Sequence, residues 1–141
     1  MKTRLEKLII SLNFTEAKAL VDSLNKVELE NYMLELCYES ENIIYYSFVF
    51  DMLKSKETSF IHYIASIILS QPLCHIEGAY QAAFYHAKKA VELDEGDIEL
   101  KEYLLFFNDI PDKLLSNQEA KILAEEIINL NPKSEVAKQY I

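Results

Sequence analysis

Tight turns are scarce in this sequence, which holds only two glycines and three prolines in 141 residues. β-Sheet proteins need many tight turns, and glycine and proline supply the backbone geometry of those turns. Apolar residues recur instead every three or four positions, as in residues 2–12. The sequence therefore predicts an all-α protein, with helices over residues 2–12, 14–24, 27–40, 59–70, 76–94, 98–109 and 119–131.

Residues 43–50, "IIYYSFVF", are the one ambiguous stretch. Their β-branched and aromatic side chains favour a strand, and a buried strand is the alternative interpretation. No alternating segment elsewhere could pair with such a strand, so we predict a buried helix.

Helix starts are marked by residues that cap the first turn. Thr58 or Ser59 can cap one helix, Asp97 the next, and Ser116 with Glu119 three positions later forms a capping box before the last long one. No Gly- or Ser-rich linker interrupts the chain. We therefore expect a single domain over residues 1–141, built from about four helix pairs and a C-terminal helical stub.

One pattern occurs twice, 37 residues apart. It places small or apolar residues at the same helical positions in "AFYHAKKAVELDEGD" and "AKILAEEIINLNPKS". Small residues at this spacing allow two helices to approach closely. The matching positions are Ala83, Ala87, Ala90 and Leu93 in the first copy and Ala120, Ala124, Ile127 and Leu130 in the second.

The spacing resembles that of tetratricopeptide repeats, which are helix–turn–helix units of about 34 residues. In that family a small residue is followed by a small or apolar residue seven positions later and by proline five positions after that. The chain carries this pattern at Ala120, Ile127 and Pro132, at Ala83 and Ala90 with Glu95 in place of proline, and weakly at Ala17 and Leu24.

The resemblance implies helical hairpins stacked as a short solenoid, with the first helix of each pair facing the concave side. The sequence departs from the family because it has no tryptophan, lacks the usual Leu-Gly pair and has longer loops. The alternative is another kind of helical bundle, in which alanine is simply a good helix former at close contacts.

The net charge of −9 bears on the partner. Nucleic acids and anionic membranes are bound through clustered basic residues, and the sequence has no such cluster, so a protein with a basic surface is the expected partner.

Cys37 and Cys74 lie in apolar surroundings and are expected to be reduced core residues of a cytoplasmic protein. The longest apolar stretch, residues 60–69, is too short to span a bilayer.

No residue pattern indicates catalysis or a cofactor. The three histidines, His62, His75 and His86, lack the spacing of metal ligands. The acidic stretch "ELDEGDIELKE" has too few oxygen ligands in register for a calcium loop. It is either a solvated turn with helix caps or an acidic rim that recognises a basic partner.

Partner-binding residues are therefore expected on the first helix of each pair, by the resemblance. Tyrosine is enriched at binding hot spots, and Glu99 and Glu102 are expected to share a helical face. The candidates are Tyr38, Glu39, His62, Glu99, Glu102 and Asp109.

The sequence thus predicts a non-enzymatic protein-interaction module, an adaptor or regulator that captures a peptide or protein. An alternative is an immunity protein that neutralises a basic bacterial toxin domain, because such proteins are often small and acidic. A scaffold subunit of a larger assembly is a further interpretation.

Overall fold

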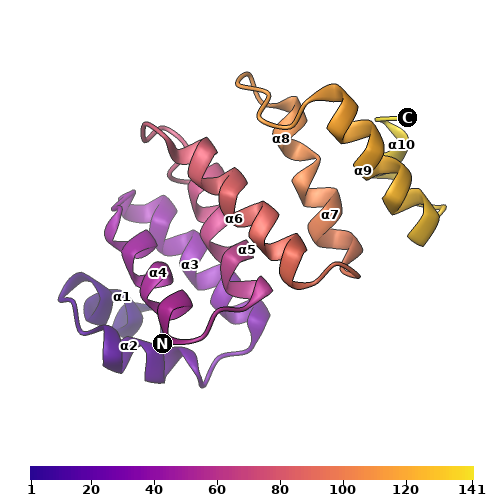
Figure 1. Ribbon diagram of the computed structural model, residues 1–141. Helices are drawn as coiled ribbons and strands as arrows, with labels where there is room; N and C mark the ends of the chain where they lie inside the picture. Colours follow the sequence, from indigo (N-terminus) through magenta and orange to yellow (C-terminus); the bar gives the residue numbers. More distant parts are fainter.

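The computed structural model describes residues 1–141 and consists of helices and connections, without strands. This confirms the all-α prediction. The elements run along the molecule in chain order, from the N-terminal helices at one end to α9 and α10 at the other (Figure 1). Their bounds are α1 Lys2–Ile10, α2 Phe14–Val21, α3 Lys26–Ser40, α4 Ile44–Ser55, α5 Ser59–Ser70, α6 Ala79–Leu93, α7 Ile98–Leu104, α8 Phe106–Asp109, α9 Asn117–Leu130 and α10 Glu135–Lys138.

The ambiguous stretch at residues 43–50 is helical and forms most of α4. Its inward face is buried in the core through Tyr45, Phe48, Val49 and Met52. These positions follow the three-to-four-residue spacing of a helix, so burial on one face outweighs the local preference for a strand.

The predicted capping residues are found at the N-termini of their helices. Thr58 caps α5 by accepting the Ile61 amide, and the Asp97 carboxylate accepts the Leu100 amide 3.1 Å away. Ser116 and Glu119 form the predicted capping box at α9. A second capping box at α3, between Asn25 and Glu28, went unpredicted although it follows the same pattern.

Several predicted helix bounds are wrong, among them the end of the second helix, expected at residue 24 and found at Val21. The helix expected from residue 76 begins at Ala79, after Gly78 in a left-handed conformation at φ 83°. The first helix ends at Ile10, because Leu12 has a positive φ of 66°. The helix expected over 98–109 divides into α7 and α8 at Leu105, where the backbone bonds shorten to i→i−3 and the turn tightens.

The most extensive seam joins α5 to α6. Within this seam the Ser66 hydroxyl on α5 donates to the backbone carbonyl of Ala83 on α6. Ala83, Ala87 and Ala90, like Ala120, Ala124 and Ile127 of α9, are all buried, which fits close helix approach at the repeated small positions. The last position of each copy behaves differently, because Leu93 and Leu130 are about half exposed at their helix ends, 48% and 52%.

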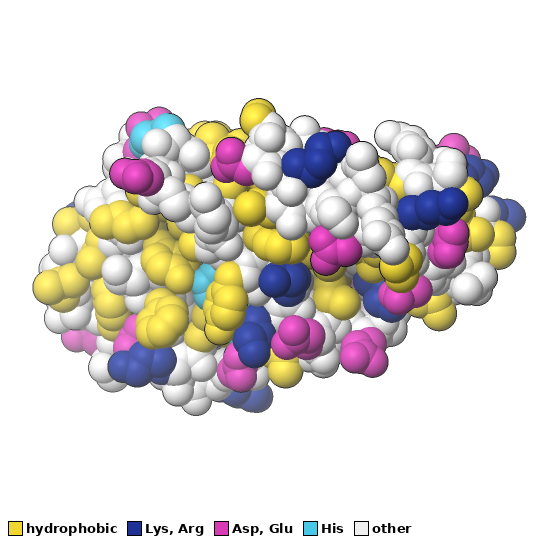
Figure 2. All heavy atoms as spheres, turned by 45° about the horizontal axis from the view of Figure 1, so that its top comes forward, with side chains coloured by type: hydrophobic (Ala, Val, Ile, Leu, Met, Phe, Trp, Pro, Cys, Tyr) yellow, Lys and Arg dark blue, Asp and Glu magenta, His cyan; other side chains and the backbone are white.

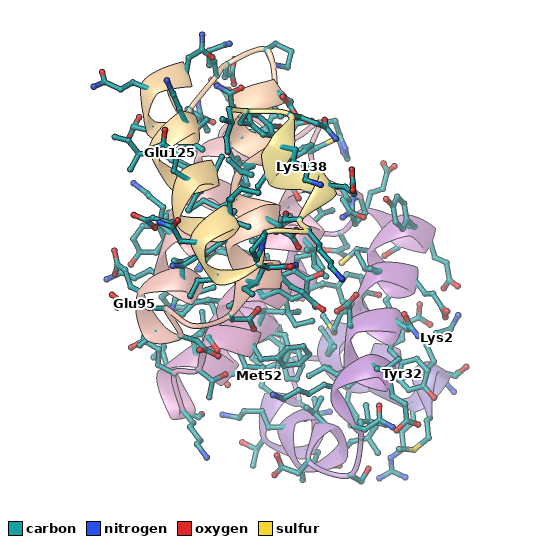
Figure 3. All side chains as sticks on the ribbon, turned by 90° about the vertical axis from the view of Figure 1, so that its right-hand side faces the viewer. Lys2, Tyr32, Met52, Glu95, Glu125 and Lys138 are labelled. Carbon is teal, nitrogen blue, oxygen red and sulfur yellow. The ribbon has the colours of Figure 1, made fainter.

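Both ends of the chain are in contact with the helices beside them. Lys2 of α1 bonds Glu35 and Glu39 of α3, at 3.1 and 2.8 Å, on the side of the protein shown with Lys2 and Tyr32 in Figure 3. At the other end, α10 packs on α9. No helix combines the length and hydropathy needed to cross a bilayer.

Candidate functional site

A groove opens where α3, α5 and α7 begin, with a volume of about 270 Å³. We call it the acidic groove. It combines carboxylates, aromatic rings and one lysine. Its lining residues are Lys26, Glu30, Ser59, Phe60, Tyr63, Asp94, Asp97, Glu99, Leu100 and Tyr103.

The caps explain why these residues meet. The three helices begin at Lys26, Ser59 and Ile98, each directly after its capping residue. Side chains of the first turn and of the following turn therefore surround the same space. The groove is a junction of three helix starts rather than a cavity inside the core.

The field in the groove is negative. Glu30, Asp94, Asp97 and Glu99 form no ion pair with any cation of the chain. Burial, and then the charge of Glu99, raise the pKa of Glu30 above its ordinary value. Burial, followed by the charge of Glu30, raises the pKa of Tyr63 to about 12. Four carboxylates are thus held close together, with Lys26 as the one cation in the groove lining.

The floor of the groove is fixed by Tyr103. Its hydroxyl lies 2.7 Å from the Ser66 Oγ and 2.9 Å from the Ser70 Oγ of α5. Its ring meets the Tyr63 ring edge to face, with centroids 5.4 Å apart. At the wall, the Lys26 ammonium lies 5.4 Å from the centroid of the Phe60 ring. Aromatic faces of this kind attract cations.

The six predicted binding residues do not form one site. Glu99 lines the acidic groove, whereas Tyr38 and Glu39 lie exposed at the far end of α3, where Glu39 holds Lys2. Glu99 and Glu102 lie three residues apart on α7 but meet different groups. Glu102 accepts the Ser134 hydroxyl beside α10.

Asp109 likewise faces the C-terminal segment, where it accepts the hydroxyl of Tyr140. Burial, together with this bond, raises the pKa of Tyr140 to about 12. Glu102 and Asp109 therefore hold the C-terminal segment of their own chain, and both are engaged there.

His62 is not at the surface as expected, because its residue is only 3% exposed. It faces α6 rather than solvent, since its position on α5 lies in the α5–α6 seam. Its Nε2 lies 2.7 Å from the Glu57 Oε2, and its Nδ1 lies 2.9 Å from the Nδ1 of His86. His86 Nε2 in turn lies 2.8 Å from the Tyr46 hydroxyl of α4. We call these four groups the histidine chain.

The groove residues Glu30, Phe60 and Tyr63 were not among the predicted binding residues. A signal for them exists, because each follows a capping residue within the first turns of its helix. That signal needs the additional knowledge that three helix starts converge. The neighbouring carboxylate Glu95, also in the α6–α7 turn, lies on the outer side of the protein, opposite Lys2 and Tyr32 (Figure 3).

A larger, more apolar pocket of about 490 Å³ lies between α2, α4 and α5, lined in part by Met52 and Ile61. One of its two lysines is already engaged, because Lys18 bonds Asp51 and Ser55 at 2.8 Å each. The acidic groove differs in gathering four carboxylates without ion pairs, where this pocket has only Asp22, and it is the stronger candidate for recognition.

The chain's potential ligating groups are dispersed. No three side chains of the His, Cys, Asp or Glu type are arranged to hold a metal ion. Cys37 is buried, and burial raises its thiol pKa to about 12, whereas Cys74 is half-buried; both are free thiols.

Comparison with known proteins finds no family model, curated protein or solved structure that matches this chain.

Proposed function

We propose that this protein is a protein-binding module of stacked, tetratricopeptide-like hairpins, and that the acidic groove takes a basic side chain of a partner. The observation that carries the proposal is the set of four carboxylates without ion pairs beside Phe60 and Tyr63. A chain that gathers like charges raises its own electrostatic free energy. A cation supplied from outside lowers it.

Arginine suits the groove better than lysine. Its planar guanidinium can bond two carboxylates at once and stack on an aromatic face. Glu30 and Glu99 supply carboxylates from α3 and α7, and Phe60 supplies a face to which Lys26 already lies close. A single arginine can therefore satisfy charge and stacking together.

The size of the groove agrees with a single side chain. Its volume of about 270 Å³ lies just below the range of about 300–1,000 Å³ typical of small-molecule pockets. The rest of the partner would lie across the neighbouring helix starts. Such a contact forms an adaptor surface rather than a closed active site.

The test uses a short arginine-rich peptide and a lysine-rich peptide of equal charge. We expect the arginine peptide to bind more tightly and to shift the amide resonances of residues 26–30, 59–63 and 97–103. Glu30→Gln with Glu99→Gln should weaken binding about tenfold or more, mainly through slower association at low salt.

The matched control is Glu125→Gln with Glu135→Gln, which removes the same charge from exposed positions outside the groove. Equal weakening by both double variants would mean that net charge alone attracts the peptide. Resonance shifts confined to other helices would place the partner surface elsewhere and overturn the proposal.

Toxin neutralisation is the second candidate. It is favoured by the net charge of −9 together with the unpaired carboxylates, because both attract a basic toxin domain. The two candidates differ in outcome. An immunity protein restores growth to cells that express its toxin, and the Glu30 and Glu99 variants should lose that protection. A cytoplasmic location and the lack of enzyme activity stay predictions.

A further inference from the structure

The histidine chain crosses three helices and one connection. Glu57 precedes α5, His62 belongs to α5, His86 to α6 and Tyr46 to α4. Both imidazoles are buried, whereas the Glu57 side chain is 55% exposed and the Tyr46 side chain is half-buried. The chain therefore connects a surface carboxylate to a tyrosine at the opposite end through two rings that solvent does not reach.

The proton positions at neutral pH follow from the partners. The hydrogen bond between Glu57 and His62 lowers the pKa of the Glu57 carboxyl. Glu57 is therefore ionised and can only accept a hydrogen bond. His62 must therefore carry a proton on Nε2, which leaves Nδ1 as the acceptor when the ring is neutral. His86 then donates through Nδ1 and accepts on Nε2 from the Tyr46 hydroxyl. Every group is satisfied, and all bonds run from Tyr46 toward Glu57.

The hydrogen-bonded pair of His62 and His86 can accept one additional proton but not two. If both rings were charged, two N–H groups would face each other across the 2.9 Å between the Nδ1 atoms. His62 is the ring that faces a carboxylate, so it is the ring on which a positive charge is stabilised. Burial, and then the charge of His62, lower the pKa of His86 to about 4.

We propose that the histidine chain is a one-proton switch: a proton taken up by His62 reverses the hydrogen bonds from His62 to Tyr46. His62 Nδ1–H then donates to His86 Nδ1. The single proton of His86 moves to Nε2 and donates to the Tyr46 oxygen. The Tyr46 hydrogen turns away from His86, so one proton gained at one end of the chain changes the hydrogen bonding of a tyrosine on another helix.

Other charged and aromatic groups lie around the histidine chain and affect its response to pH. Lys89 of α6 lies near Glu57 and lowers its pKa further, and Lys89 itself bonds Glu92. Tyr85 meets the His86 ring edge to face at 5.2 Å. Tyr46 meets the same ring at 5.6 Å and lies 6.4 Å from the ring of Phe50.

The output of the switch is therefore at the surface between α4 and α6. Phe50 and Tyr85 are about half exposed there, at 48% and 53%. In the view of Figure 2, hydrophobic side chains gather toward the N-terminal end of the protein. Protonation changes the direction in which the Tyr46 hydroxyl, beside these rings, can donate its hydrogen bond.

Nuclear magnetic resonance of the imidazole nitrogens in the intact protein tests the switch directly. Above pH 7 we expect His62 to carry its proton on Nε2 and His86 on Nδ1. On acidification, His86 should convert to the Nε2–H form in step with protonation of His62. Independent titration of the two rings, or an Nε2–H form of His86 at neutral pH, would overturn the proposal.

A variant pair gives the second readout. Glu57→Gln removes the charge that stabilises protonated His62 and should lower the switching pH by about one unit. Glu125→Gln, an exposed carboxylate on α9, should leave it unchanged. An unchanged switching pH in Glu57→Gln would show that this carboxylate does not stabilise the added proton, and the switch as proposed would fail.

Discussion

The hydroxyl of Tyr103 on α7 lies 2.7 Å from that of Ser66 on α5, and Ser66 donates onward to the Ala83 carbonyl of α6. The Ser66 hydroxyl has a single hydrogen, which it donates to Ala83. It therefore accepts the hydrogen bond from the Tyr103 hydroxyl. Tyr103 in turn accepts from Ser70. One directed set of hydrogen bonds thus links three helices beneath the acidic groove.

Removing the Tyr103 hydroxyl should therefore destabilise the fold. In Tyr103→Phe, Ser66 loses a donor and Ser70 loses its acceptor in a partly buried site, and we expect a loss of about 1–2 kcal/mol in urea unfolding. Tyr63→Phe is the matched control, since the Tyr63 hydroxyl makes no hydrogen bond within the protein and its loss should cost far less. Equal losses would mean that the serines simply rebond to their own helix.

Glu102→Ala should loosen the C-terminal segment. It removes the acceptor of the Ser134 hydroxyl, which also caps α10 through the Ala137 amide. We expect faster hydrogen exchange at the amides of Ala137 and Lys138, equivalent to about 1 kcal/mol of local stability. Glu99→Ala, three residues away in the same helix, should leave these amides as they are.

The helices were predictable because their signals are local. Asp97 and Ser116 bond the amides three residues ahead, and this spacing is visible in the sequence. The repeated alanines were recognisable for a similar reason, since each copy lies within one helix. Errors arose at Leu105 and Gly78, where packing and backbone conformation decide the bound.

The site was less predictable because it depends on how helices lie against each other. His62 and His86 are 24 residues apart, and only the register of α5 on α6 brings them together. The Glu102 carboxylate likewise accepts a hydrogen bond from Ser134, which lies 32 residues later in the sequence. Glu99 alone among the predicted residues lines the groove, because its position follows directly from the Asp97 cap.

Ala90→Phe and Ala124→Phe should each destabilise the protein. Both alanines are almost fully buried, and the larger ring would force the helices apart at a cost of about 1–3 kcal/mol. Thermal unfolding measures the effect. Lys121→Phe on the exposed face of α9 is the control and should change stability little; unchanged unfolding in the alanine variants would contradict close helix packing at these positions.

Stability should fall as the pH drops from about 6.5 to about 4. The pKa of His86 is 6.5 in its ordinary state and about 4 in the folded protein. The unfolded chain therefore takes up this proton first, and acid favours unfolding over that window. The contribution is at most about 3 kcal/mol. His86→Gln should show a shallower loss in urea unfolding at successive pH values, and parallel curves would exclude this origin.

The last prediction concerns the electrostatics of the groove itself and needs no partner. Glu99→Gln removes one like charge that raises the pKa of Glu30, so that pKa should fall. It should stay above the ordinary value, because burial is the larger cause and persists. Relief of repulsion between ionised carboxylates should also stabilise the fold at neutral pH, by only a few tenths of a kcal/mol because the groove is open to solvent. Carbon-detected titration of the Glu30 carboxyl measures the change, with Glu102→Gln as the control of equal charge. A pKa of Glu30 that moved equally in both variants, or in neither, would show that Glu30 and Glu99 do not share the groove, and the site for a basic side chain would lose its basis.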